Sequence, residues 1–314
     1  MIEQLFHALS AVLVVMLLSG VGFFLGKKGW LTADSKPFIS KLIINVGMPA
    51  LCVNNVFTYF SRDMLASSGF LLAVCLLAML LTMGASILLA RIMRVDKKRR
   101  GVFAVMCGLA NTVFVGLPMC TELFGPEAVH YVMLAYLCNT TLFWTVGALI
   151  IKRSGSSQNG RMGPVSVLKR MATPPLIAII LSIIALLIGL RPPEPVISLC
   201  SYLSGLVTPL GLIYVGFVIS ETGLRGMRMS GQMAAVMAMR FLFAPAAMLL
   251  ICGAAGISGF PRDVFVIESA MPVMTQAVVL AADAGADERF AASGITITTL
   301  ACFAAVPLLT LILA

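Results

Sequence analysis

The chain has 314 residues, of which 60% are hydrophobic and only 11% are charged. Soluble globular domains carry about 25% charged residues, so the composition excludes that class and indicates a polytopic membrane protein. The formal net charge is +9, but the basic residues fall in short connections between apolar segments. They therefore indicate membrane orientation rather than a nucleic-acid partner.

Apolar segments of about 20 residues, the length that crosses a bilayer, follow one another along the whole chain. The first segment carries its flanking positive charges, Lys27 and Lys28, after the apolar stretch, which is not the order of a cleavable signal peptide. We predict ten spans, at residues 6–26, 38–57, 66–90, 101–121, 129–151, 174–190, 196–219, 230–255, 262–282 and 290–312.

Lysine and arginine are distributed unevenly between the two sets of connections. The connections on the side of Lys27 hold seventeen of these residues, and the connections on the opposite side hold three. Basic connections stay in the cytoplasm. We therefore expect a multi-pass protein of the cell (inner) membrane with both termini outside the cytoplasm.

The longest connection is basic and rich in glycine and serine, and it separates five predicted spans from five. An odd number of spans in each half means that the second half enters the membrane upside down relative to the first, as in transporters with inverted repeats. The predicted division is a first five-helix repeat at 1–151, a cytoplasmic linker at 152–173 and a second, inverted repeat at 174–314.

The fourth span contains the most irregular stretch of the chain, CGLANTVFVGLPMC at 107–120. Gly108, Gly116 and Pro118 all weaken a helix, so we predict that the helix breaks here. In lipid, a broken helix is tolerated where protein or a cavity meets the freed backbone groups. Such breaks near the bilayer midplane form the binding sites of many secondary transporters.

Prolines interrupt other spans at corresponding places in the two halves. Pro49 lies in the second span and Pro209 in the seventh, and the ninth span is interrupted at Pro272 within ESAMPVMTQ. We therefore predict an all-α integral membrane fold of ten helices, a 5+5 inverted repeat in which the broken fourth and ninth helices cross.

Half-helices that meet at the midplane direct backbone N–H groups into the break, which favours an anion. Asn111 and Thr112 add hydrogen-bond donors, and the backbone of Met271, Pro272 and Val273 faces them from the ninth span. These residues are the predicted substrate site for a carboxylate. The alternative for Asn111 and Thr112 is interhelical hydrogen bonding that only holds the helices together.

Two ionisable side chains lie inside predicted spans. Arg240 is ten residues into the eighth span, where an arginine costs at least about 2.5 kcal/mol on insertion scales. It contacts either the anion or exposed backbone carbonyls. Glu268, in the ninth span, is a candidate for ion coupling through H⁺ or Na⁺, or else a structural partner of backbone amides. The sequence contains no metal-binding cluster, and we expect no metal and no other cofactor.

Four stretches resemble one known family in the same order. NTVFVGLPM at 111–119, INVGMPALCV at 44–53, RFLFAPA at 240–246 and AMP at 270–272 are similar to motifs of the auxin efflux carrier family. This family includes the plant PIN carriers and bacterial permeases of the malonate or malate type.

The resemblance implies crossed helices 4 and 9, an elevator-like movement of the crossover domain, and a scaffold that often forms a homodimer. It also implies that Asn111 contacts a substrate carboxylate and that Cys52 stands where the plant carriers have a serine lining the site. The charged pair that those carriers have in helix 3 has no counterpart here, so its role in coupling does not carry over.

The sequence thus predicts a secondary transporter or facilitator of small organic anions, mono- or dicarboxylates such as malonate or malate. Its expected partners are that anion and the lipid bilayer. One alternative is a Na⁺-coupled symporter of the bile-acid type. The other is a non-transporting membrane sensor. We expect no enzymatic activity, because no catalytic constellation is present.

Overall fold

The computed structural model describes residues 2–59, 62–155, 173–222 and 229–313. Most of the predicted linker at 152–173 lies outside these ranges. Within them the protein is all-helical and has no strand, and its only β-type pairing is one isolated bridge. Six helices in the described ranges are long and apolar enough to cross a membrane.

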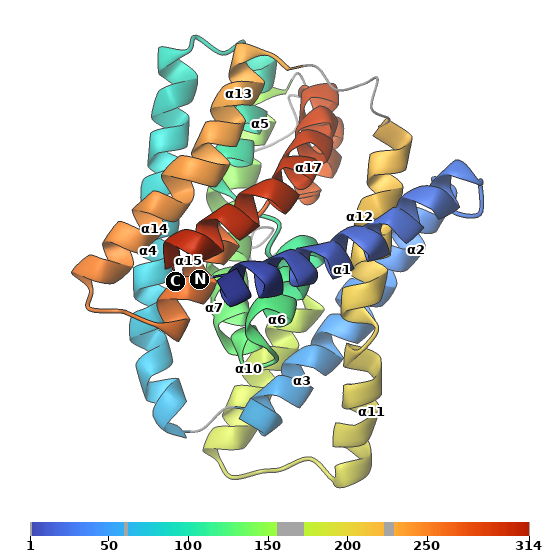
Figure 1. The fold of residues 1–314 in the computed structure, drawn as a ribbon, viewed down its shortest axis with the longest axis vertical. Helices are drawn as coiled ribbons and strands as arrows, with labels where there is room; N and C mark the ends of the chain where they lie inside the picture. Colours follow the sequence, from blue (N-terminus) through green and yellow to red (C-terminus); the bar gives the residue numbers. More distant parts are fainter. Residues whose placement is uncertain (1, 60–61, 156–172, 223–228, 314) are drawn as a thin grey trace.

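Helices cover each of the apolar segments predicted from the sequence (Figure 1). In the first half they are α1 (Ile2–Lys27), α2 (Ser35–Leu42), α3 (Met48–Tyr59), α4 (Arg62–Ile92), α5 (Lys97–Gly108), α6 (Leu117–Phe124), α7 (Ala128–Leu142) and α8 (Ala148–Ser154). In the second half they are α10 (Pro174–Leu187), α11 (Glu194–Ser204), α12 (Val207–Thr222), α13 (Gly231–Ala238), α14 (Ala244–Ala254), α15 (Phe260–Ser269), α16 (Gln276–Ala284) and α17 (Glu288–Leu313).

Short π-helical turns join several of these helices, and three of the turns end two residues before a proline. They are η1 (Ile43–Gly47) before Pro49, η2 (Thr112–Gly116) before Pro118 and η5 (Met239–Phe243) before Pro245. Proline has no N–H and its ring clashes with the carbonyl four residues earlier. A π-turn widens the helix at that point, so the chain stays helical through all three prolines.

Two of the predicted proline interruptions, at Pro49 and Pro209, do not break the helix at the proline itself. At Pro49 the helix continues through η1 into α3. In the seventh span, α11 ends at Ser204 and α12 begins at Val207, which places Pro209 in the first turn of the new helix. Proline is well tolerated there, because the N–H groups of a first turn have no helical acceptor.

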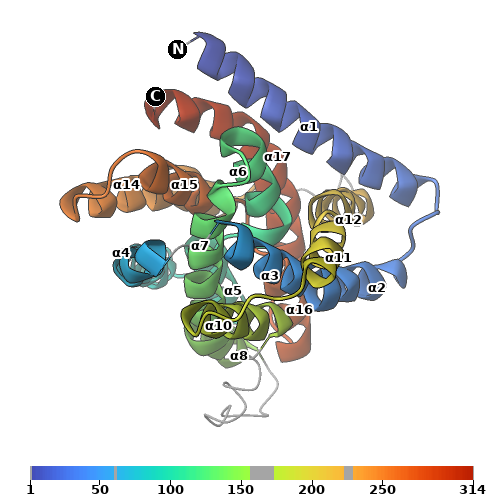
Figure 2. The same cartoon turned by 90° about the horizontal axis from the view of Figure 1, so that it is seen from below.

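The helices pack as two groups. In the first helix group, which we define as α1, α2, α3, α10, α11 and α12, α1 packs along α12 and α3 packs against α10 and α11. The second helix group comprises α4 to α8 and α13 to α17. In it, α4 packs against α5, α7 and α14, and α15 packs against α7 and α14. Figure 2 shows α1 lying along one edge, with the two chain termini close together.

Glycine allows the closest approach within the first helix group. A Cβ on Gly22 of α1 would overlap the carbonyl of Ile213, and a Cβ on Gly216 of α12 would overlap the carbonyl of Ser19. Small residues at such crossings let helix backbones approach closely, which is the usual basis of helix association in membranes.

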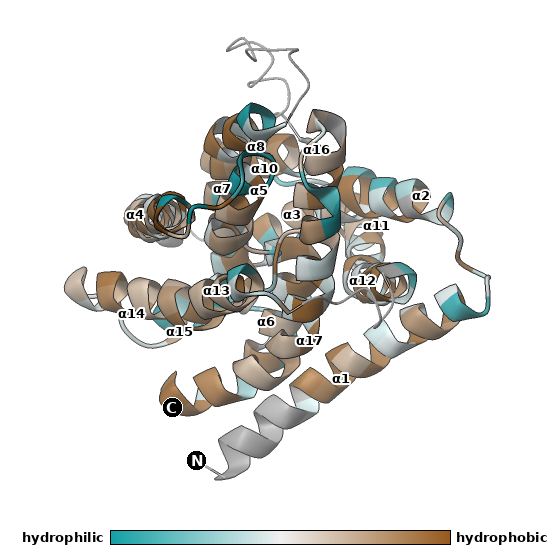
Figure 3. Ribbon diagram, turned by 90° about the horizontal axis from the view of Figure 1, so that it is seen from above, coloured by the Kyte–Doolittle hydropathy of each residue, from teal (hydrophilic) through white to brown (hydrophobic). Residues whose placement is uncertain are grey.

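Hydrophilic residues gather near helix ends, whereas the shafts are mostly hydrophobic (Figure 3). At the start of α5, Arg99 donates to Asp287 Oδ2 over 2.8 Å and to Gln232 Oε1 over 2.8 Å. Its guanidinium also lies 4.6 Å from the ring centroid of Phe290. One arginine thus ties together the starts of α5, α13 and α17.

Candidate functional site

The two interrupted segments meet at their breaks. α5 ends at Gly108 and the helix resumes at Thr112, while α15 ends at Ser269 and α16 begins at Gln276. Between these ends Ala110 and Val273 form an antiparallel bridge. The N–H of the next residue in the first break, Asn111, donates to the carbonyl of Pro272 over 2.8 Å. The breaks are therefore joined by backbone hydrogen bonds.

Polar side chains from two neighbouring helices hold the extended backbone of each break. Asn139 of α7 accepts from the N–H of Ala110 over 3.1 Å and donates to its carbonyl over 2.9 Å. Thr298 of α17 accepts from the N–H of Val273 over 3.0 Å. Backbone groups at this depth need such partners, because lipid supplies none. Asn139 and Thr298 therefore hold the two breaks in place.

The C-terminal ends of α5 and α15 point their carbonyls at one side chain, Arg240. Its guanidinium donates to the carbonyls of Ser269 over 2.6 Å, of Met271 over 2.8 and 2.9 Å, and of Cys107 over 3.4 Å. Arg240 is only 1% exposed. Helix C-termini carry partial negative charge, so a cation here is electrostatically favoured. We call these three carbonyls the carbonyl pole.

The N-terminal ends of the resumed helices, at Thr112 and Gln276, lie on the other side of the bridge, and we call them the amide pole. Asn111 caps the first of them, since its Oδ1 accepts from the N–H of Phe114 over 3.1 Å. Its Nδ2 donates to Thr275 Oγ1 over 3.1 Å and so links the two helix starts. First-turn N–H groups have no acceptor within their own helix and carry partial positive charge.

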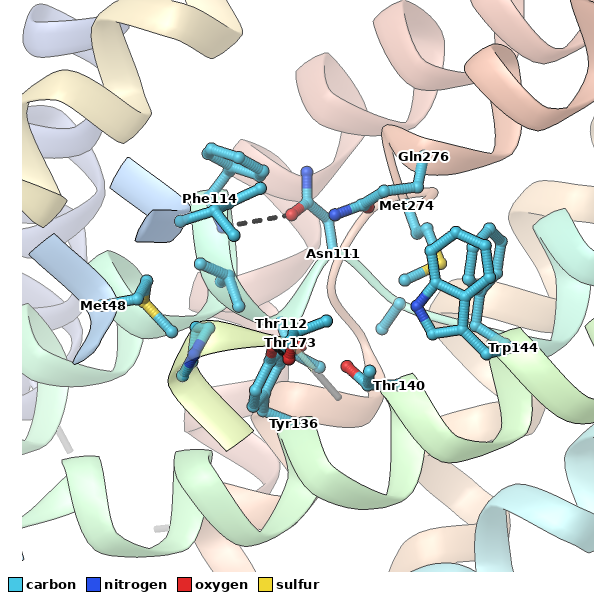
Figure 4. Close-up of a pocket in the computed structure, with 15 residues that line it drawn as sticks. Met48, Asn111, Thr112, Phe114, Tyr136, Thr140, Trp144, Thr173, Met274 and Gln276 are labelled. Atoms are coloured by element: carbon cyan, nitrogen blue, oxygen red, sulfur yellow. Dashed lines mark hydrogen bonds between the residues drawn. The ribbon is translucent and has the colours of Figure 1, made fainter. Parts of the chain in front are cut away.

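A cavity of about 240 Å³ opens onto the amide pole (Figure 4). Both helix groups contribute to it, and none of the lining residues that the structure describes is acidic or basic. Its lining residues are Ile44, Met48, Ala110, Asn111, Thr112, Val113, Phe114, Tyr136, Thr140, Phe143, Trp144, Thr173, Pro175, Met274 and Gln276. An anion in this cavity would meet helix N-termini and neutral donors without a competing carboxylate.

The structure separates the residues predicted to bind substrate. Asn111 and Thr112 line the cavity, whereas Arg240 lies at the carbonyl pole. Met271, Pro272 and Val273 form the backbone of the second break and do not line the cavity. Cys52 is buried one turn beyond Met48, with its Sγ 4.0 Å from Met133 Sδ, and it does not line the cavity either.

Several lining residues were not predicted from the sequence. Tyr136, Thr140 and Trp144 come from α7 and the π-turn that follows it, and Gln276 opens α16. Tyr136 reaches the first helix group, where its hydroxyl lies 3.4 Å from Thr173 Oγ1. The only local signal is the helical spacing of Tyr136, Thr140 and Trp144, each four residues apart on one face.

Glu268 lies near the end of α15 and is completely buried. Its Oε1 accepts only from the thiol of Cys120, over 3.4 Å, and its Oε2 has no hydrogen-bond partner among the described residues. A Cβ on Gly116 would come within 2.5 Å of this carboxyl group, so any larger residue there would displace the Glu268 side chain. Likewise, a Cβ on Gly108 would come within 3.0 Å of Met83 Sδ.

Comparison with known proteins agrees with this arrangement of apolar helices. A family model described as "Membrane transport protein" matches residues 7–310. An uncharacterized transporter of Methanocaldococcus jannaschii is 28% identical over 300 residues, which cover 93% of this chain and 94% of that protein. An uncharacterized transporter of Methanothermobacter thermautotrophicus is 28% identical over 308 residues, or 97% and 98% of the two chains.

The family match also confirms the resemblance found in the four sequence motifs. It extends over nearly the whole chain, including both breaks and the cavity between the helix groups. The protein belongs to the membrane transport family that includes the PIN-like auxin efflux carriers.

Proposed function

We propose that this protein is a secondary transporter or facilitator of small organic anions, which bind through a carboxylate at the amide pole. The observation that carries the proposal is the cavity, onto which two helix N-termini open with no acidic side chain among its described lining residues. Helix N-termini are ready-made anion sites. Asn111 and Thr112 supply further donors to the carboxylate.

The lining narrows the substrate class. Apart from the amide pole, the described part of the lining consists of aromatic, aliphatic and methionine side chains with a few hydroxyls, and it contains no lysine, arginine or histidine. A second carboxylate on the substrate would have to leave water without a charged partner, which is costly. Among carboxylates, this favours a monocarboxylate with an apolar body over a dicarboxylate such as malonate.

The same proposal includes the ten-helix inverted repeat, with spans 4 and 9 crossing and the halves at 1–151 and 174–314. Corresponding features of the two halves support it: the fourth span of each half opens into extended backbone, and each of these two breaks is held by the following span through Asn139 or Thr298. The basic connections further support an inner-membrane protein with both termini outside the cytoplasm.

Transport would occur by an elevator-type movement of the second helix group against the first. The cavity lies between the groups, with Ile44, Met48 and Pro175 on one side and Asn111 and Met274 on the other. A sliding of one group would carry the amide pole, which belongs wholly to the second group, across the membrane. Glu268, buried with one carboxylate oxygen unpaired, is the proposed ion-coupling residue.

A binding experiment on purified protein tests the carboxylate assignment. The apparent melting temperature is measured with a panel of mono- and dicarboxylates and with the uncharged amide of each. A bound ligand stabilises the folded state by about 2.7 kcal/mol at a hundredfold excess over its dissociation constant. We expect stabilisation by carboxylates only. A panel in which amides stabilise as well as their acids would refute the anion site.

A further inference from the structure

The carbonyl pole has the composition of a cation site. Other transporters with broken helices use unwound backbone carbonyls and half-helix C-terminal ends to coordinate Na⁺. Here the carbonyls of Cys107, Ser269 and Met271 converge in the same way, but each accepts a hydrogen bond from Arg240. The guanidinium occupies the position that a coordinated cation would take.

Little open space adjoins Arg240 in the described part of the chain. The cavity adjoining it measures only about 10 Å³, which is at most the space of a single water molecule. The buried acid of this region, Glu268, turns to the thiol of Cys120 and not to the carbonyl pole. Because a guanidinium stays protonated in proteins, the positive charge at the carbonyl pole is permanent.

We propose that Arg240 is a resident cation that takes the place of a coupling Na⁺, so that this protein binds its substrate without Na⁺. The side chain of Arg240 extends from η5, in the eighth span. It joins the C-terminal ends of α5 and α15. The inference deepens the proposed transport function, and it argues against the Na⁺-coupled alternative.

The first test uses the wild-type protein in detergent and Na⁺ itself as the probe. The melting temperature is recorded while NaCl replaces choline chloride at constant ionic strength, with KCl as a second reference. The proposal predicts the same melting temperature in all three salts. A stabilisation specific to Na⁺ that saturates with concentration would overturn it. This test needs no substrate, so its outcome is independent of the carboxylate proposal.

The second test removes the guanidinium from the carbonyl pole. Arg240→Met removes the charge and leaves the three carbonyls without a donor, and Arg99→Met is the matched control, because Arg99 also binds several partners at a helix junction. We expect Arg240→Met alone to be stabilised by Na⁺ or by millimolar guanidinium. A folded Arg240→Met protein that responds to neither ion, or an Arg99→Met protein that responds equally, would contradict the proposal. If Arg240→Met does not fold, the wild-type salt series decides.

Discussion

The carbonyl pole and the amide pole are formed by the same two interrupted segments but are completed differently. At the carbonyl pole, three converging carbonyls are satisfied by the buried guanidinium of Arg240. At the amide pole, two helix N-termini face a cavity of about 240 Å³, and no residue that the structure places in its lining is charged. On the two proposals above, the protein supplies its own cation and leaves the amide pole open for an anion.

The difference follows from what each pole does. Broken helices expose partial charges of both signs. At membrane depth, each exposed N–H or carbonyl group costs free energy unless it has a partner. A permanent partner at the carbonyl pole keeps the fold together. On the proposed function, an exchangeable anion completes the amide pole. Each of the following predictions tests one side of this contrast, starting with the largest expected effect.

A disulfide between the helix groups should abolish transport. An ideal Cβ at Gly211 of α12 would lie 3.7 Å from the Cα of Phe114 in η2, which suits a disulfide. Oxidising the Phe114→Cys/Gly211→Cys protein should stop uptake of a carboxylate that the wild type transports, and reduction should restore it. The two single variants treated with the same oxidant are the controls. Undiminished uptake by the cross-linked protein would rule out movement between the groups.

Removing the resident cation should cost much of the folding stability. Arg240→Met leaves three buried carbonyls without donors, each worth about 1–3 kcal/mol, and we expect a loss of about 3 kcal/mol or more. The control is Arg262→Met, whose guanidinium pairs with Asp263 near the surface over 2.7 Å and contributes less than about 1 kcal/mol. If both variants lose the same free energy of unfolding in denaturant titrations, the carbonyl contacts of Arg240 contribute no more to stability than a surface ion pair.

At the amide pole, Asn111→Ala should weaken carboxylate binding at least tenfold, about 1.4 kcal/mol. The free energy of unfolding should fall by only about 1 kcal/mol, the usual contribution of a helix cap. The hydrogen bond to Pro272 is kept, because it uses the backbone N–H of Asn111. Asn139→Ala, which removes both bonds to Ala110, should show the reverse pattern. Calorimetric titration and thermal unfolding of both variants provide the comparison.

Neutralising Glu268 should have the smallest effect, a change in the pH profile of uptake. Four titratable groups lie close enough to Glu268 to interact with it electrostatically, and they are Cys75, Cys120, Arg240 and Cys302. If Glu268 carries the coupling proton, uptake by Glu268→Gln loses the pH dependence of the wild type. An unaltered profile would make Glu268 a structural residue.

The sequence predicted the helical segments well because long apolar runs have few alternatives in a membrane protein. The start of α10 at Pro174 and the break after Gly108 both fall where the pattern placed them. The π-turns were missed, because a proline alone does not reveal whether a helix breaks or widens. Pro49 is the example, since η1 lets the helix continue through it.

The candidate site was predictable only in part. Asn111 and Thr112 were found because glycine and proline surround them in the sequence. Trp144 and Gln276 gave no such signal, since their role depends on which segments the fold brings together. Arg240 shows the limit most clearly: its depth left open whether it contacts an anion or exposed backbone carbonyls, and only the structure identifies the carbonyls of Ser269 and Met271 as its partners.

The most direct measurement of the central claim is a fluorescence titration at the cavity. The chain has two tryptophans, Trp144 in the lining and Trp30, which is 77% exposed. In a Trp30→Phe background, a carboxylate that binds at the amide pole should change Trp144 emission saturably, and its uncharged amide should not. The change should disappear with Asn111→Ala. An equal response to the amide, or one that survives in Asn111→Ala, would contradict an anion site at the amide pole.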